Sequence, residues 1–167
     1  MQAVLISIHP GWCKEIFAFL GYDNRRPLYK KRLELRKTAP KSTPFKCYIY
    51  CTKGNIDLVP SKIWWKKDHT GFEHILNGMV IAEFTCDYIV RHCEMSNADL
   101  AEEMSCVSRE DILRYSNGRE VVGWHISDLK IYDKPRELSE FSKYGFGHPV
   151  PLKRPPQSWM YVEASDE

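Results

Sequence analysis

The sequence predicts an α+β protein, a small mixed β barrel of about six strands with short helices packed outside it. Short apolar segments bounded by turn residues recur along the chain, which is the pattern of strands. The helical segments do not alternate regularly with these strands, which argues against a doubly wound parallel sheet. No internal repeat is visible, and 167 residues suit one compact domain. We place this domain at residues 1–163, followed by an acidic tail at 164–167.

The first half of the chain opens with an apolar strand at 3–8, which Pro10 and Gly11 end. Residues 12–20 repeat apolar side chains at helical spacing and predict an amphipathic helix. The other elements assigned to this half are strands at 32–37 and 45–51 and a helix at 61–67.

The second half begins with the tight-turn pair Asn77-Gly78, followed by an apolar strand at 79–86 that we extend toward residue 90. Ser108 is a good N-cap for a short helix at 108–116. Residues 145–156 are rich in Gly and Pro and predict a loop. The other elements assigned to this half are a helix at 97–104, strands at 121–127, 129–132 and 159–163, and one helical turn within 135–141.

Composition excludes several classes of protein. With 43% hydrophobic and 28% charged residues the chain is an ordinary globular protein, and a net charge of +2 means that any basic surface is local. No segment has the length and apolarity of a membrane span, and the N-terminus lacks the basic start of a signal peptide, so we expect a cytoplasmic protein with no membrane partner. The six cysteines are then reduced thiols. They form no Cys-x-x-Cys pair, and we predict neither a metal site nor a cofactor.

The segment from Lys31 to Arg36 is the most informative stretch of the chain. On a strand, Leu33 and Leu35 share one face, while Arg32, Glu34 and Arg36 share the other. A carboxylate between two guanidinium groups suits the wall of a site that binds anions, and a desolvated Lys31 would serve as a reactive amine. The same stripe also suits an exposed, charged edge strand that resists aggregation.

Glu83 is the second candidate, because it lies inside an otherwise apolar strand. On a central strand its carboxylate must be paired or must have a raised pKa, and either state suits a general base or a ligand contact. The alternative is simple outward alternation on the face that Ile81 and Thr85 would share.

Basic residues surround several tryptophans. Trp64 and Trp65 are flanked by lysines, and Trp159 follows Lys153 and Arg154. Cations for phosphate and flat rings for bases are what a single-stranded nucleic-acid surface needs, although each cluster alone is better explained by a core tryptophan bordered by solvated lysines.

His125 follows Trp124 in a predicted strand and lies near Asp128. Acid–base chemistry is one interpretation and a structural hydrogen bond is the other, and no known hydrolase motif accompanies the pair.

Taken together, these residues resemble the ASCH domain, a branch of the PUA-like superfamily of small pseudo-barrels. The family motif is Gly-x-Lys-x-x-Glu-x-Arg, and Lys31, Glu34 and Arg36 fit it. Tyr29 occupies the glycine position, and Gly21 represents that glycine before an insertion at 22–29. The segments 124–132 and 154–159 are the most specific further matches to small stand-alone bacterial and phage ASCH proteins.

The resemblance implies a cleft near the motif strand and an association with RNA. It also implies a possible enzyme, since one branch of the family deacetylates acetylated cytidine with a Lys, a Thr and a Glu, and some members are ribonucleases. Lys31 and Glu83 match the first and last of these residues, and Glu34 stands at the threonine position. The implied catalytic residues are Lys31, Glu34 and Glu83, and the implied ligand contacts are Arg32, Arg36, Trp64, Trp65, Trp124, His125 and Trp159.

Three hypotheses follow. The first is a protein that binds RNA or a modified nucleoside in a charged cleft on the motif strand. The second is a metal-independent hydrolase, either an amidohydrolase acting on acetylated cytidine or a ribonuclease, that uses Lys31 and Glu83. The third is a protein-interaction module with a ligand-free barrel.

Overall fold

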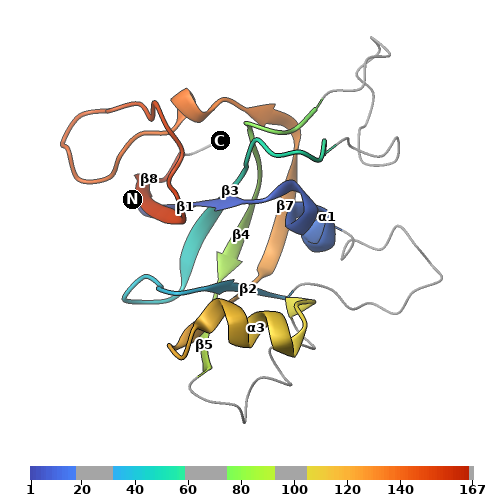
Figure 1. The fold of residues 1–167 in the computed structure, drawn as a ribbon. Coiled ribbons are helices and arrows are strands. Elements are labelled where there is room, and N and C mark those ends of the chain that lie inside the picture. Colours follow the sequence, from blue (N-terminus) through green and yellow to red (C-terminus); the bar gives the residue numbers. More distant parts are fainter. Residues whose placement is uncertain (18–31, 59–74, 93–104, 166–167) are drawn as a thin grey trace. The chain divides into compact units, whose positions relative to one another are not determined.

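The computed structural model describes residues 1–17, 32–58, 75–92 and 105–165 (Figure 1). Over these residues the chain has eight strands in two sheets, together with short helices, which confirms the α+β class. The larger sheet is not closed into a barrel. The chain divides into two compact units: the first contains Met1–Lys14, Phe45–Phe84 and Leu129–Glu167, and the second contains Glu15–Pro44 and Thr85–Asp128. The prediction of one domain at 1–163 stays a prediction.

The first unit is built on a five-stranded sheet in the order β7-β4-β3-β1-β8. β1 lies inside this sheet, parallel to β3 on one side and antiparallel to β8 on the other (Figure 1). Six of the seven residues of β1 are buried, as expected for a central strand. The strands are β1 (Gln2–Ile8), β3 (Phe45–Cys51), β4 (Val80–Cys86), β7 (Ser127–Arg136) and β8 (Trp159–Glu163).

An apolar cluster on this sheet forms the core of the first unit. Leu5, Tyr48 and Val162 come from neighbouring strands, and Phe141 packs its ring edge-on against Tyr48 with ring centroids 4.9 Å apart. The Tyr48 hydroxyl donates to the Ser165 carbonyl and accepts from the Ser165 backbone N–H. The predicted C-terminal tail is therefore joined to the core through Ser165.

The second unit is built on a three-stranded antiparallel sheet in the order β2-β6-β5, with α3 packed on one face. Leu33 and Leu35 from β2 form its core with Ile112 and Val121. The structure therefore confirms that the two leucines share the core-facing side of the motif strand. The elements are β2 (Leu33–Arg36), β5 (Ile89–His92), α3 (Arg109–Ser116) and β6 (Val121–His125).

Most predicted elements agree with the structure within a residue or two, but several boundaries were wrong. The strand predicted at 129–132 is longer, because β7 runs from Ser127 to Arg136. The first helix, α1 (Pro10–Phe17), begins at Pro10 rather than after Gly11, because proline is favoured in the first helical position. The strand at 79–86 does not continue to residue 90, because the chain leaves β4 at Cys86 and begins β5 at Ile89 in the other sheet.

Other predictions were correct. The helical turn expected within 135–141 is the 3₁₀ helix η3 (Leu138–Glu140). Ser108 caps α3, its hydroxyl accepting from the Asp111 backbone N–H, and Asn117 ends this helix in the left-handed conformation with φ 47°. The helices predicted at 61–67 and 97–104 lie outside the described residues. Across the part that is described, no helix combines the length and apolarity that crossing a bilayer requires.

Candidate functional site

The motif strand β2 carries a buried ion pair. Arg36 Nη2 lies 2.9 Å from Glu34 Oε1, and Glu34 is only 5% exposed. The two residues share one face because their spacing of two positions is the period of a strand. β2 is an edge strand of its sheet, as one interpretation of the sequence held, but this pair is withdrawn from solvent.

β6 places an indole ring beside this pair. Trp124 is the register partner of Glu34 on one side and of Ile89 on the other, so their side chains lie in a row across the same face. Trp124 is fully buried, so its ring packs within the protein instead of lying open to a ligand.

A second group of polar residues lies where β4 ends and β5 begins. His125 Nδ1 lies 2.6 Å from Asp87 Oδ1, and the His125 ring stacks on Tyr88 with centroids 4.2 Å apart and an interplanar angle of 15°. Partial desolvation works to raise the pKa of Asp87, but the hydrogen bond with His125, the charge of His125 and backbone hydrogen bonds together leave the pKa below its ordinary value. The carboxylate partner of His125 is therefore Asp87, whereas the sequence had suggested Asp128.

In the first unit, Glu83 lies between cation and hydroxyl donors from the two neighbouring strands. Lys46 Nζ on β3 is 3.1 Å from Glu83 Oε2, and the Tyr132 hydroxyl on β7 donates to the same oxygen at 2.7 Å. Glu83 is thus a paired carboxylate and not a simple outward-facing residue, and its side chain is 14% exposed.

The pKa values of both donors follow from this contact. Partial burial works to lower the pKa of Lys46, but the hydrogen bonds and charge interactions with Glu83 and Tyr48 together leave the pKa raised. Burial raises the pKa of Tyr132, and the hydrogen bond to Glu83 raises it further. Lys46 therefore stays a cation and Tyr132 a proton donor throughout the neutral range.

Known structures share this architecture. The chain is similar to the crystal structure of ASCH from Zymomonas mobilis, with a TM-score of 0.62 and 17% identity, over 96% of this chain and 87% of that chain. The chain has an ASCH-like fold. Two point mutants of the Zymomonas protein match with TM-scores of 0.56 and 0.57 and identities of 16% and 18%; each alignment covers 96% of this chain and 90% and 88% of theirs. No protein-family model and no curated protein matches the sequence.

The ASCH-like fold agrees with the architecture expected from the motif residues. The structure brings together Glu34, Arg36 and Trp124 on one sheet of the second unit, and Arg32 lies exposed just before β2. The Arg32 carbonyl accepts from the Ile126 backbone N–H at 2.8 Å, which fixes the start of the motif strand against the end of β6.

The other predicted residues lie elsewhere. Glu83 and Trp159 belong to the first unit, where Trp159 is partly buried and packs edge-on against Tyr161 with ring centroids 5.3 Å apart. Lys31, Trp64 and Trp65 lie outside the described residues, and their predicted roles stay predictions.

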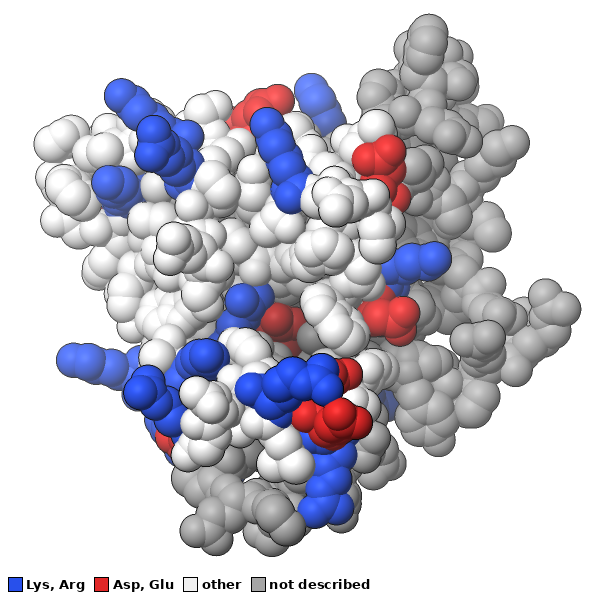
Figure 2. Space-filling model, viewed as in Figure 1, with Lys and Arg blue, Asp and Glu red and all other residues white. Residues whose placement is uncertain are grey.

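Charged side chains are mixed on the face seen in Figure 2. Lys and Arg are spread over it, and acidic side chains lie beside them over α3, where Arg114 pairs with Glu110 and Asp111. This view agrees with a chain of low net charge, so recognition of an anion must depend on a few positioned cations.

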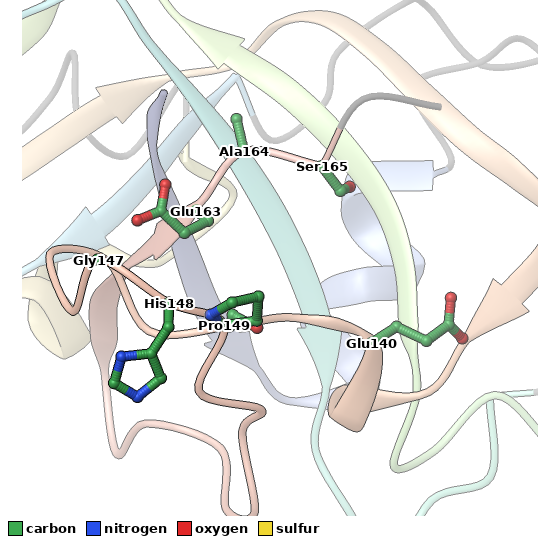
Figure 3. Close-up of a pocket in the computed structure, with 8 residues that line it drawn as sticks. Glu140, Gly147, His148, Pro149, Glu163, Ala164 and Ser165 are labelled. Atoms are coloured by element: carbon green, nitrogen blue, oxygen red, sulfur yellow. The ribbon is translucent and has the colours of Figure 1, made fainter.

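A cavity of 540 Å³ lies in the first unit between η3, the following loop and the end of β8 (Figure 3). Glu140 and Glu163 line it with His148. Both carboxylates serve local contacts: Glu140 accepts from the Glu137 backbone N–H and from Arg136, and Glu163 accepts from Gly145. None of these residues belonged to the predicted site.

Sequence reasoning missed Tyr88 and Asp87 beside His125, and Lys46 and Tyr132 beside Glu83. The sequence did indicate that Glu83 has a partner such as Lys46, since a buried carboxylate on a central strand needs one on the next strand. Asp87 gave no comparable signal, because its carboxylate is exposed and does not require a protein partner.

Proposed function

We propose that this protein binds RNA or a modified nucleoside at the motif strand. The observation that carries the proposal is the buried Glu34–Arg36 ion pair on β2, next to the exposed Arg32. Withdrawing two charges from water costs several kcal/mol per ion by typical estimates, and a three-stranded sheet does not need such a pair to fold. We therefore infer that the pair has a role in binding.

The chemistry of the pair suits a nucleobase and its phosphate. A guanidinium group donates in a planar fork to phosphate or to a base carbonyl, and a carboxylate accepts from an exocyclic amino group. In this proposal Arg32 meets the phosphate, and Arg36, whose side chain keeps 12% exposure, offers its guanidinium group to the base while the buried Glu34 holds it in place. The ASCH-like fold supports it through the association with RNA that the resemblance implies.

The phosphate contact predicts a change in salt dependence. Arg32→Ala should weaken binding of a fluorescent single-stranded RNA and make the slope of log K against log salt shallower by about 0.7, because one phosphate contact is lost. The measurement is fluorescence anisotropy between 50 and 200 mM salt, values chosen to span the steep range of such titrations.

The matched control is Arg119→Ala, which removes an exposed arginine of the same unit just after α3. If both variants change the slope equally, the cation effect is nonspecific and Arg32 has no special place. If wild-type protein binds neither RNA nor nucleosides at the lowest salt, the proposed function is wrong.

One observation favours the alternative, a metal-independent hydrolase. Tyr132 and Lys46 both contact Oε2 of Glu83, which fixes the orientation of the carboxylate that would serve as the base. The sequence assigns the reactive amine to Lys31, which lies outside the described residues.

We expect Glu83→Gln and Lys31→Ala to abolish any product formed from acetylated cytidine or RNA in buffer with EDTA, and Glu110→Gln to leave it unchanged. Glu110 is a suitable control because it is an exposed carboxylate paired with Arg114 on α3. Product that persists in Glu83→Gln would rule out Glu83 as the base, and tight binding without product would leave only the binding function.

A further inference from the structure

Tyr88 is an exposed aromatic residue with an unusually fixed position. It lies in the two-residue break between β4 and β5 and is 42% exposed. The His125 imidazole covers one face of its ring. Part of the ring surface that His125 does not cover therefore reaches solvent, as a stacking surface requires.

The backbone of Tyr88 is held from two sides. Its carbonyl accepts from the His125 backbone N–H at 3.1 Å and from the Cys86 thiol at 3.3 Å. Just beyond, the Ser127 hydroxyl donates to the Thr85 carbonyl at 2.8 Å, so the end of β4 is tied to the start of β7. Binding of a ligand to Tyr88 would therefore not require this segment to become ordered first.

The ring behind Tyr88 is fixed as well. Asp87 accepts or shares the proton of His125 Nδ1 at 2.6 Å, which orients the imidazole under the phenol ring. The two rings are close to parallel, so a third flat ring can continue the same stack.

A cation lies within electrostatic reach of this stack. Burial raises the pKa of Tyr88 and the charge of Asp87 adds to the rise, while the positive charge of Arg32 acts in the opposite direction. Arg32 is the residue to which the proposed function assigns a phosphate. An exposed flat ring and an arginine close by are the two parts of a single-stranded nucleic-acid subsite.

We propose that the open face of Tyr88 is the stacking platform for one nucleobase of the ligand, and that His125 and Asp87 are positioning residues that hold the platform. This inference rests on the proposed function and names the part of the second unit that takes the base. The shared chemistry is a nucleobase with a neighbouring phosphate, whether it belongs to single-stranded RNA or to a free nucleotide.

The test compares four tyrosine variants in the full chain. Tyr88→Ala should weaken binding of a labelled single-stranded RNA about 5- to 150-fold, which is the range of one base–aromatic stack. Tyr88→Phe and Tyr88→Trp should retain wild-type affinity. Tyr88→Leu keeps an apolar side chain against His125 but removes the aromatic face, and should bind as weakly as Tyr88→Ala.

Tyr144→Ala is the matched control, because Tyr144 is also 42% exposed and lies in the first unit. The slope of affinity against salt separates the two roles: Tyr88→Ala should leave it unchanged, whereas Arg32→Ala should reduce it. A second titration with nucleoside monophosphates and with nucleosides distinguishes a free nucleotide from an RNA strand.

The outcomes separate this inference from the function on which it rests. If wild-type protein binds and Tyr88→Leu binds equally well, the stacking platform is wrong while the binding function stands. If wild-type protein binds none of these ligands, the function itself is wrong. If Tyr144→Ala weakens binding as much as Tyr88→Ala, the effect is not specific to the platform and the inference is overturned.

Discussion

At the scale of single residues, the two carboxylates singled out above are held in different ways. Glu34 meets a guanidinium group on its own strand, two positions away. Glu83 meets Lys46 and Tyr132 on the strands to either side of it. The first contact is fixed by the strand period, whereas the second depends on which strands become neighbours in the sheet.

The Glu34–Arg36 pair makes a strong prediction for stability. Glu34→Leu should destabilise the protein by about 3–5 kcal/mol, because it leaves the charge of Arg36 largely buried without its partner. The measurement is the midpoint of urea unfolding followed by circular dichroism. The double variant Glu34→Leu/Arg36→Leu should recover much of the loss, because neither charge then remains buried.

The control is Glu110→Leu, which breaks an exposed pair with Arg114 on α3. We expect a far smaller change there, because exposed ion pairs contribute little. A double variant that is no more stable than Glu34→Leu would contradict this prediction, because it would show that the unpaired charge of Arg36 is not the source of the loss.

Much of the motif strand could be predicted because its information is local. Alternation alone placed Leu33 and Leu35 on the core face and Glu34 with Arg36 on the other. The surroundings of His125 could not be predicted, because Asp87 and Tyr88 reach it only through the pairing of β5 with β6. A single sequence does not reveal which strands will be neighbours in a sheet.

At the scale of elements, α3 shows how little sequence is needed to define a short helix. Ser108 begins it, Asn117 ends it, and Arg114 pairs with Glu110 and Asp111 along its exposed side. One buried residue, Ile112, attaches it to the sheet. A helix of eight residues depends on such end contacts because it is too short to be stable alone.

The N-cap of α3 can be tested directly. Ser108→Ala should cost about 1 kcal/mol, because the Asp111 backbone N–H loses its acceptor. Ser116→Ala is the control at the last helical residue, where the hydroxyl donates only to the Leu113 carbonyl. Since alanine favours helices, that change should be neutral or slightly stabilising. Equal losses in thermal unfolding would mean that the cap has no special role.

At the scale of the whole molecule, only one residue separates two consecutive strands that belong to different sheets. β6 ends at His125 and β7 begins at Ser127, with only Ile126 between them, and Asp128 adopts φ 48° just after the change. A strand that was predicted as one run of residues at 121–127 is therefore divided between two sheets. The alternation expected of a strand continues through the residue between the two strands, so the sequence alone did not reveal the change of sheet.

The position of β1 also has a consequence for how the protein is made. β1 pairs with β3 early in the chain, but its other edge is covered only by β8, where Gln2 lies opposite Glu163. During synthesis from the N-terminus, this apolar strand must wait for almost the entire chain before its second edge is closed. Contacts of such long sequence separation form slowly, and an uncovered strand edge invites pairing with other chains. The edge of β1 that β8 covers is thus open to such pairing until β8 has been synthesised.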